Sequence, residues 1–330
     1  MIEEQILNTI KKYDLIKPNE TVICGVSGGP DSMCMLDNLR KIKETKKIRF
    51  EIVVCHVNHL IREEAVEDEK YVINYCKKNK IKYYTKRIDV IQYANNKKQG
   101  TEEAGRNIRY EFFNEILKKE NAQKIAIAHN KNDKVETIIM NILRGSGISG
   151  LKGIEPIRHN KYIRPIIDIE RELIEKYCEE NNLYPKIDKT NFVNNCTRNK
   201  IRNIVIPYIK EEFNPNIIKT LNRLSEVIEE EDSYLNKIVS DIYSELRISE
   251  TNTQIVLDLK KFNSQENIIK QRVILYTINK TIGNVQNIEK VNVDDIIKLC
   301  KNNIGNKFLK PNKNIKILVK KSQIFFEAKN

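Results

Sequence analysis

Apolar runs alternate with amphipathic segments through the first two thirds of the 330-residue chain. Short aliphatic runs predict buried strands, and positions repeating every three to four residues predict helices between them. We expect strands at 21–27, 49–59, 82–90, 124–129 and 162–167, and helices at 2–13, 30–44, 63–79, 101–120, 132–145 and 170–182. This alternation is typical of βαβ units, so we predict an α/β fold with a doubly wound parallel sheet covered on both faces.

The pattern changes after residue 214. Residues 214–246 have helical periodicity almost without turn signals, and two more helical stretches lie within 266–300. From Lys301 onwards, short strand-like runs such as IKILVK and QIFFEA alternate with turns. The length alone indicates about two domains. We therefore predict a catalytic domain at 1–214 and a smaller, mainly helical domain with a short β end at 215–330.

The net charge of +13, from 58 basic and 45 acidic residues, is distributed unevenly. Residues 1–220 carry +9, residues 221–300 carry −3, and the last thirty residues carry +7. The basic end is either a surface that contacts phosphates or a solvated Lys-rich end. With 40% hydrophobic and 31% charged residues, the composition is that of a globular protein and not of a disordered one.

The sequence also excludes several classes of protein. It contains no run of about 18 apolar residues, so we expect no transmembrane helix. The acidic, amphipathic start MIEEQILNTIKKYDL is unlike a signal peptide. Seven cysteines without a CxxC pair argue against a disulfide framework and against a cysteine-based zinc or iron–sulfur site. We therefore expect a cytoplasmic protein.

The strongest chemical signal is the segment Ser27-Gly28-Gly29-Pro30-Asp31-Ser32, between the first strand and its helix. Two glycines let backbone N–H groups approach an anion closely, and the following helix N-terminus attracts negative charge. Asp31 would be repelled by a bare phosphate, so its presence indicates Mg²⁺ held between carboxylate and phosphate. The segment has no Lys and differs from the GxxxxGK[ST] loop. The alternative is a simple Gly-rich turn.

This segment resembles the SGGxDS pyrophosphate loop of the N-type ATP pyrophosphatase superfamily, whose fold is that of adenine nucleotide alpha hydrolases. Members of the superfamily split ATP between the α- and β-phosphates and adenylate a carbonyl oxygen of their substrate. The resemblance therefore implies that ATP binds at Ser27, Gly28, Gly29, Pro30, Asp31 and Ser32.

Three further segments follow or lie beside strand ends and would converge on one cleft. They are His56–Arg62, followed by the acidic residues Glu63, Glu64, Glu67 and Asp68; Glu103–Tyr110; and Ala126–Thr137, followed by Leu143-Arg144-Gly145. Alone, each has a simpler explanation. His56 and His59 can be structural, Arg106 and Arg109 can be surface charges, and Asp133 can be a helix N-cap.

Together these segments resemble the tRNA(Ile)-lysidine synthetase family, which shows HVxHGLR, AR-x-x-RY and GHHxxDQxET in this order. A fourth block agrees, with Asp188, Asn191, Arg198-Asn199-Lys200-Ile201-Arg202 and Pro207. The departures are Leu60 for Gly, Gly105 for Ala, Asn130 for the second His and Lys134 for Gln. The chain resembles the short members of the family, which lack the last C-terminal domain, and its basic end is a candidate for part of that domain's hold on tRNA.

The resemblance implies ligation of free L-lysine to C2 of the wobble cytidine of a CAU-anticodon tRNA(Ile), through an adenylated cytidine. It implies ATP and Mg²⁺ as cofactors, with Asp31 and Asp133 as metal ligands and His56 among the nucleotide-binding residues. Arg109 and Arg202 are expected to clamp phosphate or cytidine, and His129 to position substrate or leaving group. A homodimer is expected by resemblance only. The alternatives are a cytidine-thiolating relative and a non-catalytic nucleotide- or RNA-binding relative.

Overall fold

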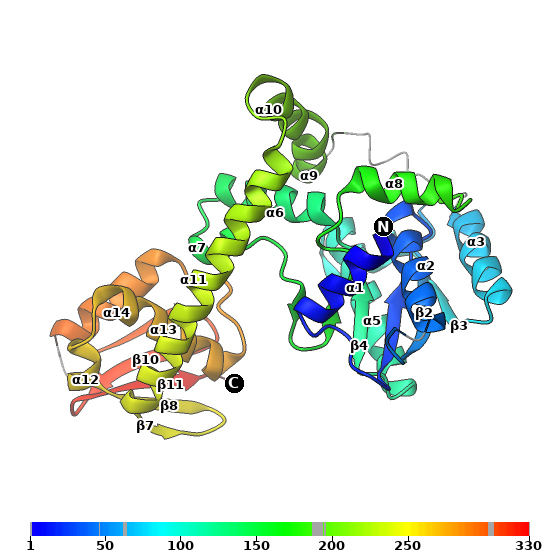
Figure 1. Cartoon of the computed structure of the whole chain (residues 1–330). Coiled ribbons are helices and arrows are strands. Elements are labelled where there is room, and N and C mark those ends of the chain that lie inside the picture. Colours follow the sequence, from blue (N-terminus) through cyan, green and yellow to red (C-terminus); the bar gives the residue numbers. More distant parts are fainter. Residues whose placement is uncertain are drawn as a thin grey trace. The chain divides into compact units, whose positions relative to one another are not determined.

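The computed structural model describes residues 2–45, 47–61, 65–186, 194, 196–302 and 307–329. The chain forms two compact units, Met1–Ile228 and Glu229–Asn330 (Figure 1). Each unit has a hydrophobic core of its own, so each is described separately. The domain boundary expected between 214 and 215 lies just ahead of the helix that leads from the first unit into the second. The assignment of residues 1–214 as a catalytic domain and of 215–330 as a second domain stays a prediction.

A six-stranded sheet with the order β3-β2-β1-β4-β6-β5 forms the centre of the first unit. The strand β1 (Thr21–Gly25) lies inside it, parallel to β2 (Glu51–Asn58) and β4 (Lys124–Ile127). On either side follow the parallel strands β3 (Lys82–Arg87) and β6 (Tyr162–Ile163), and β5 (Ile157–Arg158) pairs antiparallel with β6. The five parallel strands end at one edge, the side of an open α/β sheet where ligands bind.

Helices cover both faces of this sheet (Figure 1), because alternate residues of each strand point to opposite sides. Val22 and Cys24 of β1 pack in one core cluster, and Ile23 packs in another with Phe112 and Phe113 of α5 (Thr101–Lys119). The helices that contribute to the first cluster are α1 (Ile2–Lys12), α2 (Pro30–Glu44), α3 (Ala65–Lys78) and α8 (Arg171–Glu180). The predicted doubly wound α/β fold is confirmed.

The fifth strand is shorter than the sequence indicates. The apolar run 162–167 predicts six strand residues, but only Tyr162 and Ile163 pair. Pro165 has no N–H to donate to a neighbouring strand, so the ladder ends before it. The helices α4 (Val90–Lys97) and α7 (Ile148–Leu151) lie where the sequence analysis assigned no helix, whereas α6 (Lys131–Leu143) lies where a helix was expected.

A chain of helices continues the first unit after the segment 187–193, none of which is described. It comprises α9 (Thr197–Lys200), a π-helical turn (Ile201–Val205), α10 (Ile206–Glu212) and α11 (Ile217–Leu246). The wider turn ends two residues before Pro207. A proline cannot donate to the carbonyl four residues earlier and would clash with it in an α-helix, so the wider turn relieves that conflict.

The second unit contains a five-stranded antiparallel sheet with the order β7-β8-β11-β10-β9. Its strands are β7 (Arg247–Glu250), β8 (Gln254–Asp258), β9 (Phe308–Asn312), β10 (Ile315–Lys320) and β11 (Gln323–Ala328). Its helices, besides the end of α11, are α12 (Leu259–Asn263), α13 (Asn267–Ile282) and α14 (Lys290–Asn302). The helical part was predicted, but β7 and β8 were missed.

The basic C-terminal segment is an integral part of this sheet. Ile315, Ile317 and Val319 of β10, with Ile324 and Phe326 of β11, are fully buried in the second core. Their lysine neighbours project elsewhere because side chains alternate along a strand. The segment therefore combines a structural core with a basic surface.

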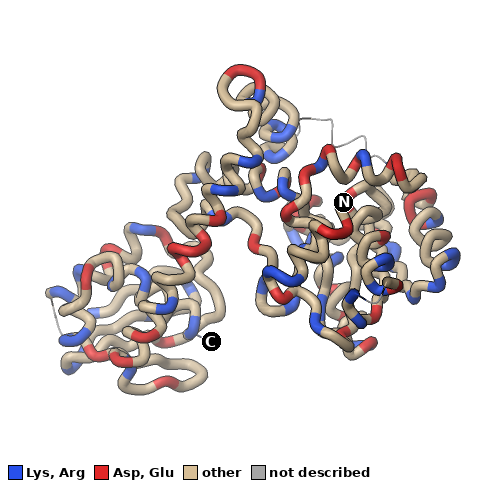
Figure 2. The backbone as a smooth tube through the Cα atoms, viewed as in Figure 1, with Lys and Arg blue, Asp and Glu red and all other residues tan. Residues whose placement is uncertain are grey.

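Basic and acidic residues are interspersed along both units (Figure 2). In the part of the chain that the structure describes, no helix is long and apolar enough to span a membrane.

Candidate active site

The loop between β1 and α2 is held in shape by its own hydroxyl groups. The Oγ atom of Ser32 accepts hydrogen bonds from the backbone N–H groups of Ser27, at 3.1 Å, and Gly28, at 3.2 Å. It also donates to the carbonyl of Gly29 at 3.0 Å and lies 3.1 Å from Oγ of Ser27. Pro30 occupies the start of α2, where its missing N–H costs nothing. The loop is thus held by hydrogen bonds within its own residues.

Gly28 and Gly29 have different roles in this loop. Gly28 is buried with φ at +91°, in the left-handed region that side chains other than glycine rarely adopt. Gly29 is the N-cap of α2, with φ at −79° and ψ at 167°, an extended conformation open to any residue. The turn therefore requires glycine only at position 28, and glycine at 29 leaves the approach to the helix N-terminus open.

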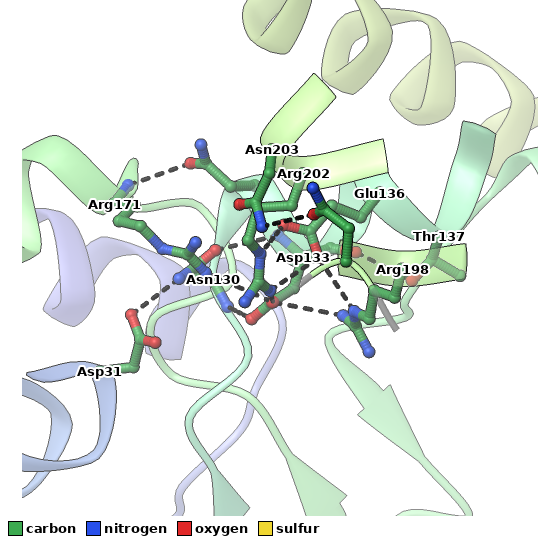
Figure 3. Close-up of polar contacts among 11 residues, drawn as sticks. Asp31, Asn130, Asp133, Glu136, Thr137, Arg171, Arg198, Arg202 and Asn203 are labelled. Atoms are coloured by element: carbon green, nitrogen blue, oxygen red, sulfur yellow. Dashed lines mark hydrogen bonds and ion pairs between the residues drawn. The ribbon is translucent and has the colours of Figure 1, made fainter. Parts of the chain in front are cut away.

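Asp31 in the first turn of α2 contacts the neighbouring strand end through Asn130. Nδ2 of Asn130 donates to Oδ1 of Asp31 at 2.7 Å (Figure 3). Burial, followed by the carboxylate of Asp133, raises the pKa of Asp31 to about 6, while Arg171 and the hydrogen bond from Asn130 oppose the shift. Nearby positive charge is thus too weak to offset the burial of Asp31 and its repulsion by Asp133.

The start of α6 fixes the second carboxylate. The side chain of Asn130 accepts from the backbone N–H of Asp133, and Oδ2 of Asp133 accepts from the backbone N–H of Asn130, each at 3.0 Å. This reciprocal pair is a capping box. The helix N-cap is therefore Asn130 and not Asp133, which corrects the simpler explanation considered for Asp133. The residue that replaces the family's second His consequently has a clear structural role.

A partly buried ion-pair network extends from Asp133 to the π-helical turn (Figure 3). Oδ1 of Asp133 lies 3.1 Å from Nη2 of Arg202 and 3.2 Å from Nη2 of Arg198. Glu136, one helical turn further along α6, accepts from Nε of Arg202 at 2.6 Å, from its Nη2 at 2.8 Å and from Nε of Arg198 at 2.9 Å. Glu136 is only 1% exposed. Removing one member of such a network leaves an uncompensated buried charge.

A second group of basic residues surrounds His129, at the end of β4. Nε of Arg164 donates to Nδ1 of His129 at 3.0 Å. Burial and then the positive charge of Arg164, followed by Arg198, Arg106 and Arg109, hold the pKa of His129 well below its usual range. Arg109 itself, on α5, donates from Nε to the carbonyl of Gly105 at 3.3 Å. It forms no ion pair with a described carboxylate. Its charge is therefore available to bind a phosphate, and that role stays a prediction.

The two histidines at the end of β2 are buried to different degrees. Nδ1 of His56 lies 2.8 Å from the carbonyl of Val26 and so ties β2 to the loop after β1. Its Nε2 is buried and has no partner in the described part of the chain. Burial lowers the pKa of His56, and burial with Arg109 lowers that of His59 to about 4. Both rings are therefore neutral near pH 7.

The structure brings together most of the predicted site residues. Asp31, Asp133 and Arg202 belong to one contact network, and His129 and Arg109 lie in the same basic neighbourhood. Glu136, Arg198, Arg171, Asn130 and Arg164 were given no role from the sequence. The spacing held a signal for two of them, since Glu136 is one helical turn from Asp133 and Arg198 is four residues before Arg202. Arg62, Glu63, Glu64, Asp188 and Asn191, quoted for the resemblance, lie outside the described residues.

The two carboxylates predicted to bind Mg²⁺ differ in how well they fit that role. Asp31 fits, because its partly buried carboxylate lies in the field of another carboxylate and makes one hydrogen bond, from Asn130, within the described residues. Asp133 is already engaged through both oxygens, by arginines and by the N–H of Asn130. No cluster of three or more His, Cys, Asp or Glu able to hold a metal exists among the described residues. A site of one or two carboxylates is still what Mg²⁺ uses when phosphates complete its shell.

The seven cysteines are free, and only Cys196 is partly exposed. Cys24, Cys34, Cys55 and Cys76 are buried in the core, as the sequence indicates. Burial raises the pKa of the Cys55 thiol and of the Cys76 thiol to about 12. Reactive thiols are exposed and have a lowered pKa, so these buried residues are structural.

Comparison with known proteins agrees with this geometry. The family model described as PP-loop domain matches residues 1–209. The tRNA(Ile)-lysidine synthase of Clostridium acetobutylicum is 44% identical over 308 residues, which are 93% of this chain and 66% of that protein. The enzymes of Clostridium tetani (44% over 325 residues) and Clostridioides difficile (41% over 325 residues) match 98% of this chain and 68% and 70% of their own length. The chain thus spans about two thirds of the length of these relatives.

Among solved structures, the U34-tRNA thiolase of Methanococcus maripaludis superposes with a TM-score of 0.56 at 20% sequence identity. The match covers 69% of this chain and 78% of the thiolase, and at this identity it shows the fold alone. The matched family model and the extensive identity to its curated relatives together establish that this chain belongs to the tRNA(Ile)-lysidine synthase family of PP-loop proteins.

Proposed function

We propose that the protein ligates free L-lysine to C2 of the wobble cytidine of tRNA(Ile) with a CAU anticodon, using ATP and releasing AMP and pyrophosphate. The observation that supports this most directly is the contact network of Asp31, Asn130, Asp133 and Arg202 next to the Ser27–Ser32 loop. It combines a phosphate-binding loop, two carboxylates and fixed guanidinium groups at the carboxyl edge of one sheet.

In the first half of the reaction, the C2 oxygen of cytidine attacks the α-phosphate of ATP and pyrophosphate leaves. Negative charge grows on the phosphates, so cations must be in place beforehand. Arg202 is held in place by Asp133 and Glu136, and Arg109 forms no ion pair with any described carboxylate, so its charge is available to a phosphate. Asp31 would hold Mg²⁺, which would neutralise part of the phosphate charge.

In the second half, the amine of lysine attacks the adenylated C2 and AMP leaves. A pyrimidine carbonyl is a poor electrophile, and adenylation supplies the leaving group that makes the attack feasible. Because His56, His59 and His129 all have lowered pKa values, their rings are neutral near pH 7 and do not repel a positively charged amino acid.

The wobble base must leave the anticodon stack to reach this edge. The rest of the tRNA then needs further contacts, and the strands β9 to β11 offer a basic surface. Lys310 and Lys316 lie over the ring of Phe308, with Nζ 5.5 Å and 5.2 Å from its centroid. Lys310 and then Lys316 lower the pKa of Lys329. We call Lys310, Lys316 and Lys329, together with Phe308, the basic β surface. We propose that these lysines contact tRNA phosphates.

The deciding experiment incubates the protein with ATP, labelled lysine and unmodified CAU tRNA(Ile). We expect lysine incorporation that depends on ATP and on the cytidine at the wobble position. Absence of both lysine transfer and AMP release would favour a non-catalytic relative, whereas a sulfur-containing product made without lysine would favour a thiolating one. A homodimer stays a prediction that sedimentation equilibrium tests.

A further inference from the structure

Arg164 carries a buried charge without the partner that such a charge normally has. It directly follows β6 and is only 4% exposed. Its Nε donates to Nδ1 of His129 at 3.0 Å, and its Nη1 donates to the carbonyl of Glu155. No carboxylate among the described residues forms an ion pair with it. Buried guanidinium groups are nearly always paired with an anion, so this one indicates either an absent ligand or a positioning role.

The hydrogen bond to Arg164 fixes the tautomer of His129. A guanidinium group has donors and no acceptor, so Nδ1 of the imidazole must be the unprotonated nitrogen. The single ring proton of neutral His129 is therefore on Nε2. The charged groups that lower the pKa of the ring are Arg164 after β6, Arg198 on α9, and Arg106 and Arg109 on α5. All four are cations, so they oppose protonation of the ring and keep it a donor through Nε2–H.

The two arginines of α5 that act on the pKa of this histidine also lack an ion-pair partner among the described residues. Arg109 bonds to its own helix at the carbonyl of Gly105, and the guanidinium of Arg106 lies 5.2 Å from the centroid of the Tyr110 ring. Neither forms an ion pair with a described carboxylate. On the other side of the site, by contrast, Arg198 and Arg202 are neutralised by Asp133 and Glu136. The positive charge that is free to bind an anion therefore lies at the edge between β4 and β6.

We propose that Arg164 is a positioning residue that fixes His129 as an Nε2–H donor, and that His129, Arg106 and Arg109 form a subsite for a phosphate oxyanion at the β4–β6 edge. The oxyanion comes either from the ATP-derived pyrophosphate or from the RNA phosphodiester backbone. The choice of these two molecules as sources of the oxyanion rests on the proposed function. The state of His129 follows from the geometry alone.

The first test is independent of any ligand. The chain has four histidines, so ring-nitrogen NMR spectra of the full-length protein can be assigned with His129→Gln. We expect His129 to be neutral with the proton on Nε2 from pH 6 to 8. In Arg164→Gln, the pKa of His129 should rise, because one of the positive charges that oppose its protonation is removed. A proton on Nδ1, or titration of His129 near its ordinary pKa in the unaltered protein, would overturn the proposal.

The second test measures binding of inorganic pyrophosphate and, separately, of an unmodified CAU anticodon stem–loop RNA. Arg164→Gln should weaken at least one of them about tenfold or more, as expected for a charge-assisted contact. Arg164→Lys, which keeps a charged donor, should restore much of the loss. The matched control is Arg49→Gln, an exposed arginine just before β2 at the opposite edge of the sheet.

Loss confined to pyrophosphate assigns the subsite to the nucleotide, and loss confined to RNA assigns it to the backbone. If Arg164→Gln and Arg164→Lys both bind each probe as Arg49→Gln does, the subsite does not exist. Circular dichroism checks that each variant is folded, and the Lys variant keeps the test decisive if the Gln variant is not. Failure of the unaltered protein to transfer lysine would refute the proposed function and would leave these binding results standing.

Discussion

Asn130 donates a 2.7 Å hydrogen bond to Asp31 and thereby joins the first turns of two helices that lie 99 positions apart in the chain. The same amide caps α6 and accepts from the N–H of Asp133. A single neutral side chain therefore sets the spacing of the two carboxylates without adding or cancelling charge. Asp31 is left as the carboxylate that most needs a cation.

Replacement of Asp31 by asparagine should stabilise the ligand-free protein in a pH-dependent way. The pKa of Asp31 is raised from 3.8 to about 6, so the folded state holds this proton more tightly than the unfolded state. Stability therefore falls as the pH rises through that window, and the Asp31→Asn substitution removes the fall. The gain should be absent below about pH 4 and complete above about pH 6, at most about 3 kcal/mol. Urea unfolding at several pH values measures it, and an equal gain at all pH values would contradict it.

Asp133→Asn should separate catalysis from tRNA binding. The amide can keep the hydrogen bond to the N–H of Asn130, but it withdraws negative charge from Arg198 and Arg202. We expect pyrophosphate release to fall about 100-fold or more, the size of effect seen when one preorganised electrostatic group is lost. The affinity for tRNA should change little. An equal loss of both would instead assign Asp133 a purely structural role.

Glu136→Gln should be strongly destabilising. Glu136 is buried, and its two oxygens accept from Arg202 and Arg198 over 2.6 to 2.9 Å. The substitution leaves two guanidinium groups short of negative charge, and breaking a buried pair costs about 3–5 kcal/mol. The control is Glu51→Gln, which breaks the exposed pair with Lys43 at 2.6 Å and should cost at most about 1 kcal/mol. If urea unfolding gave similar losses of stability for the two variants, the network would contribute no more to stability than an exposed ion pair does.

Two alanine substitutions distinguish the glycines of the loop. Gly28→Ala forces a side chain into a left-handed conformation at φ +91°, at a cost of about 1–2 kcal/mol. Gly29→Ala meets no conformational barrier, and its Cβ would lie 3.5 Å from Oγ of Ser27, an ordinary contact. Thermal unfolding should therefore show a clear loss for Gly28→Ala and almost none for Gly29→Ala. The reverse order would mean that the turn is formed differently.

The basic β surface should contribute a salt-dependent part of tRNA affinity. The segment 301–330 cannot be deleted for this test, because β10 and β11 belong to the core of the second unit. The variant is instead Lys310→Gln, Lys316→Gln and Lys329→Gln combined. Each lost phosphate contact should reduce the slope of log affinity against log salt by about 0.7–0.9. The control replaces Lys17, Lys78 and Lys176, exposed lysines of the first unit, by Gln. Equal slopes for the two variants would exclude this surface.

Much of the first unit could be predicted because its strands are continuous apolar runs with helices between them. The position of Asp133 at the start of α6 was also predictable, since it belongs to a short contiguous motif, Ala126–Thr137. The ion pairs of Asp133 with Arg198 and Arg202 were not, because they join residues more than sixty positions apart through side-chain contacts that no local pattern encodes. Periodicity specifies a face of a helix and does not specify what lies against that face.

Other errors have local causes. The run 162–167 is apolar throughout most of its length, but Pro165 ends the strand ladder after two residues. The strands β7 and β8 are four and five residues long and flank a polar turn, so their alternation is too short to be recognised. The sequence analysis treats Asn130 only as a departure from the family pattern, although an amide is well suited to capping a helix and donating to a carboxylate.

Cys196 provides a way to observe the site in solution. Six of the seven thiols are buried, and Cys196 alone is partly exposed, as the N-cap of α9 two residues before Arg198. A thiol-reactive fluorophore should therefore label the unaltered protein at one place, without prior removal of other cysteines. Such a label would report, in real time and without radioactivity, how the environment of α9 changes as ATP, lysine and tRNA are added one by one.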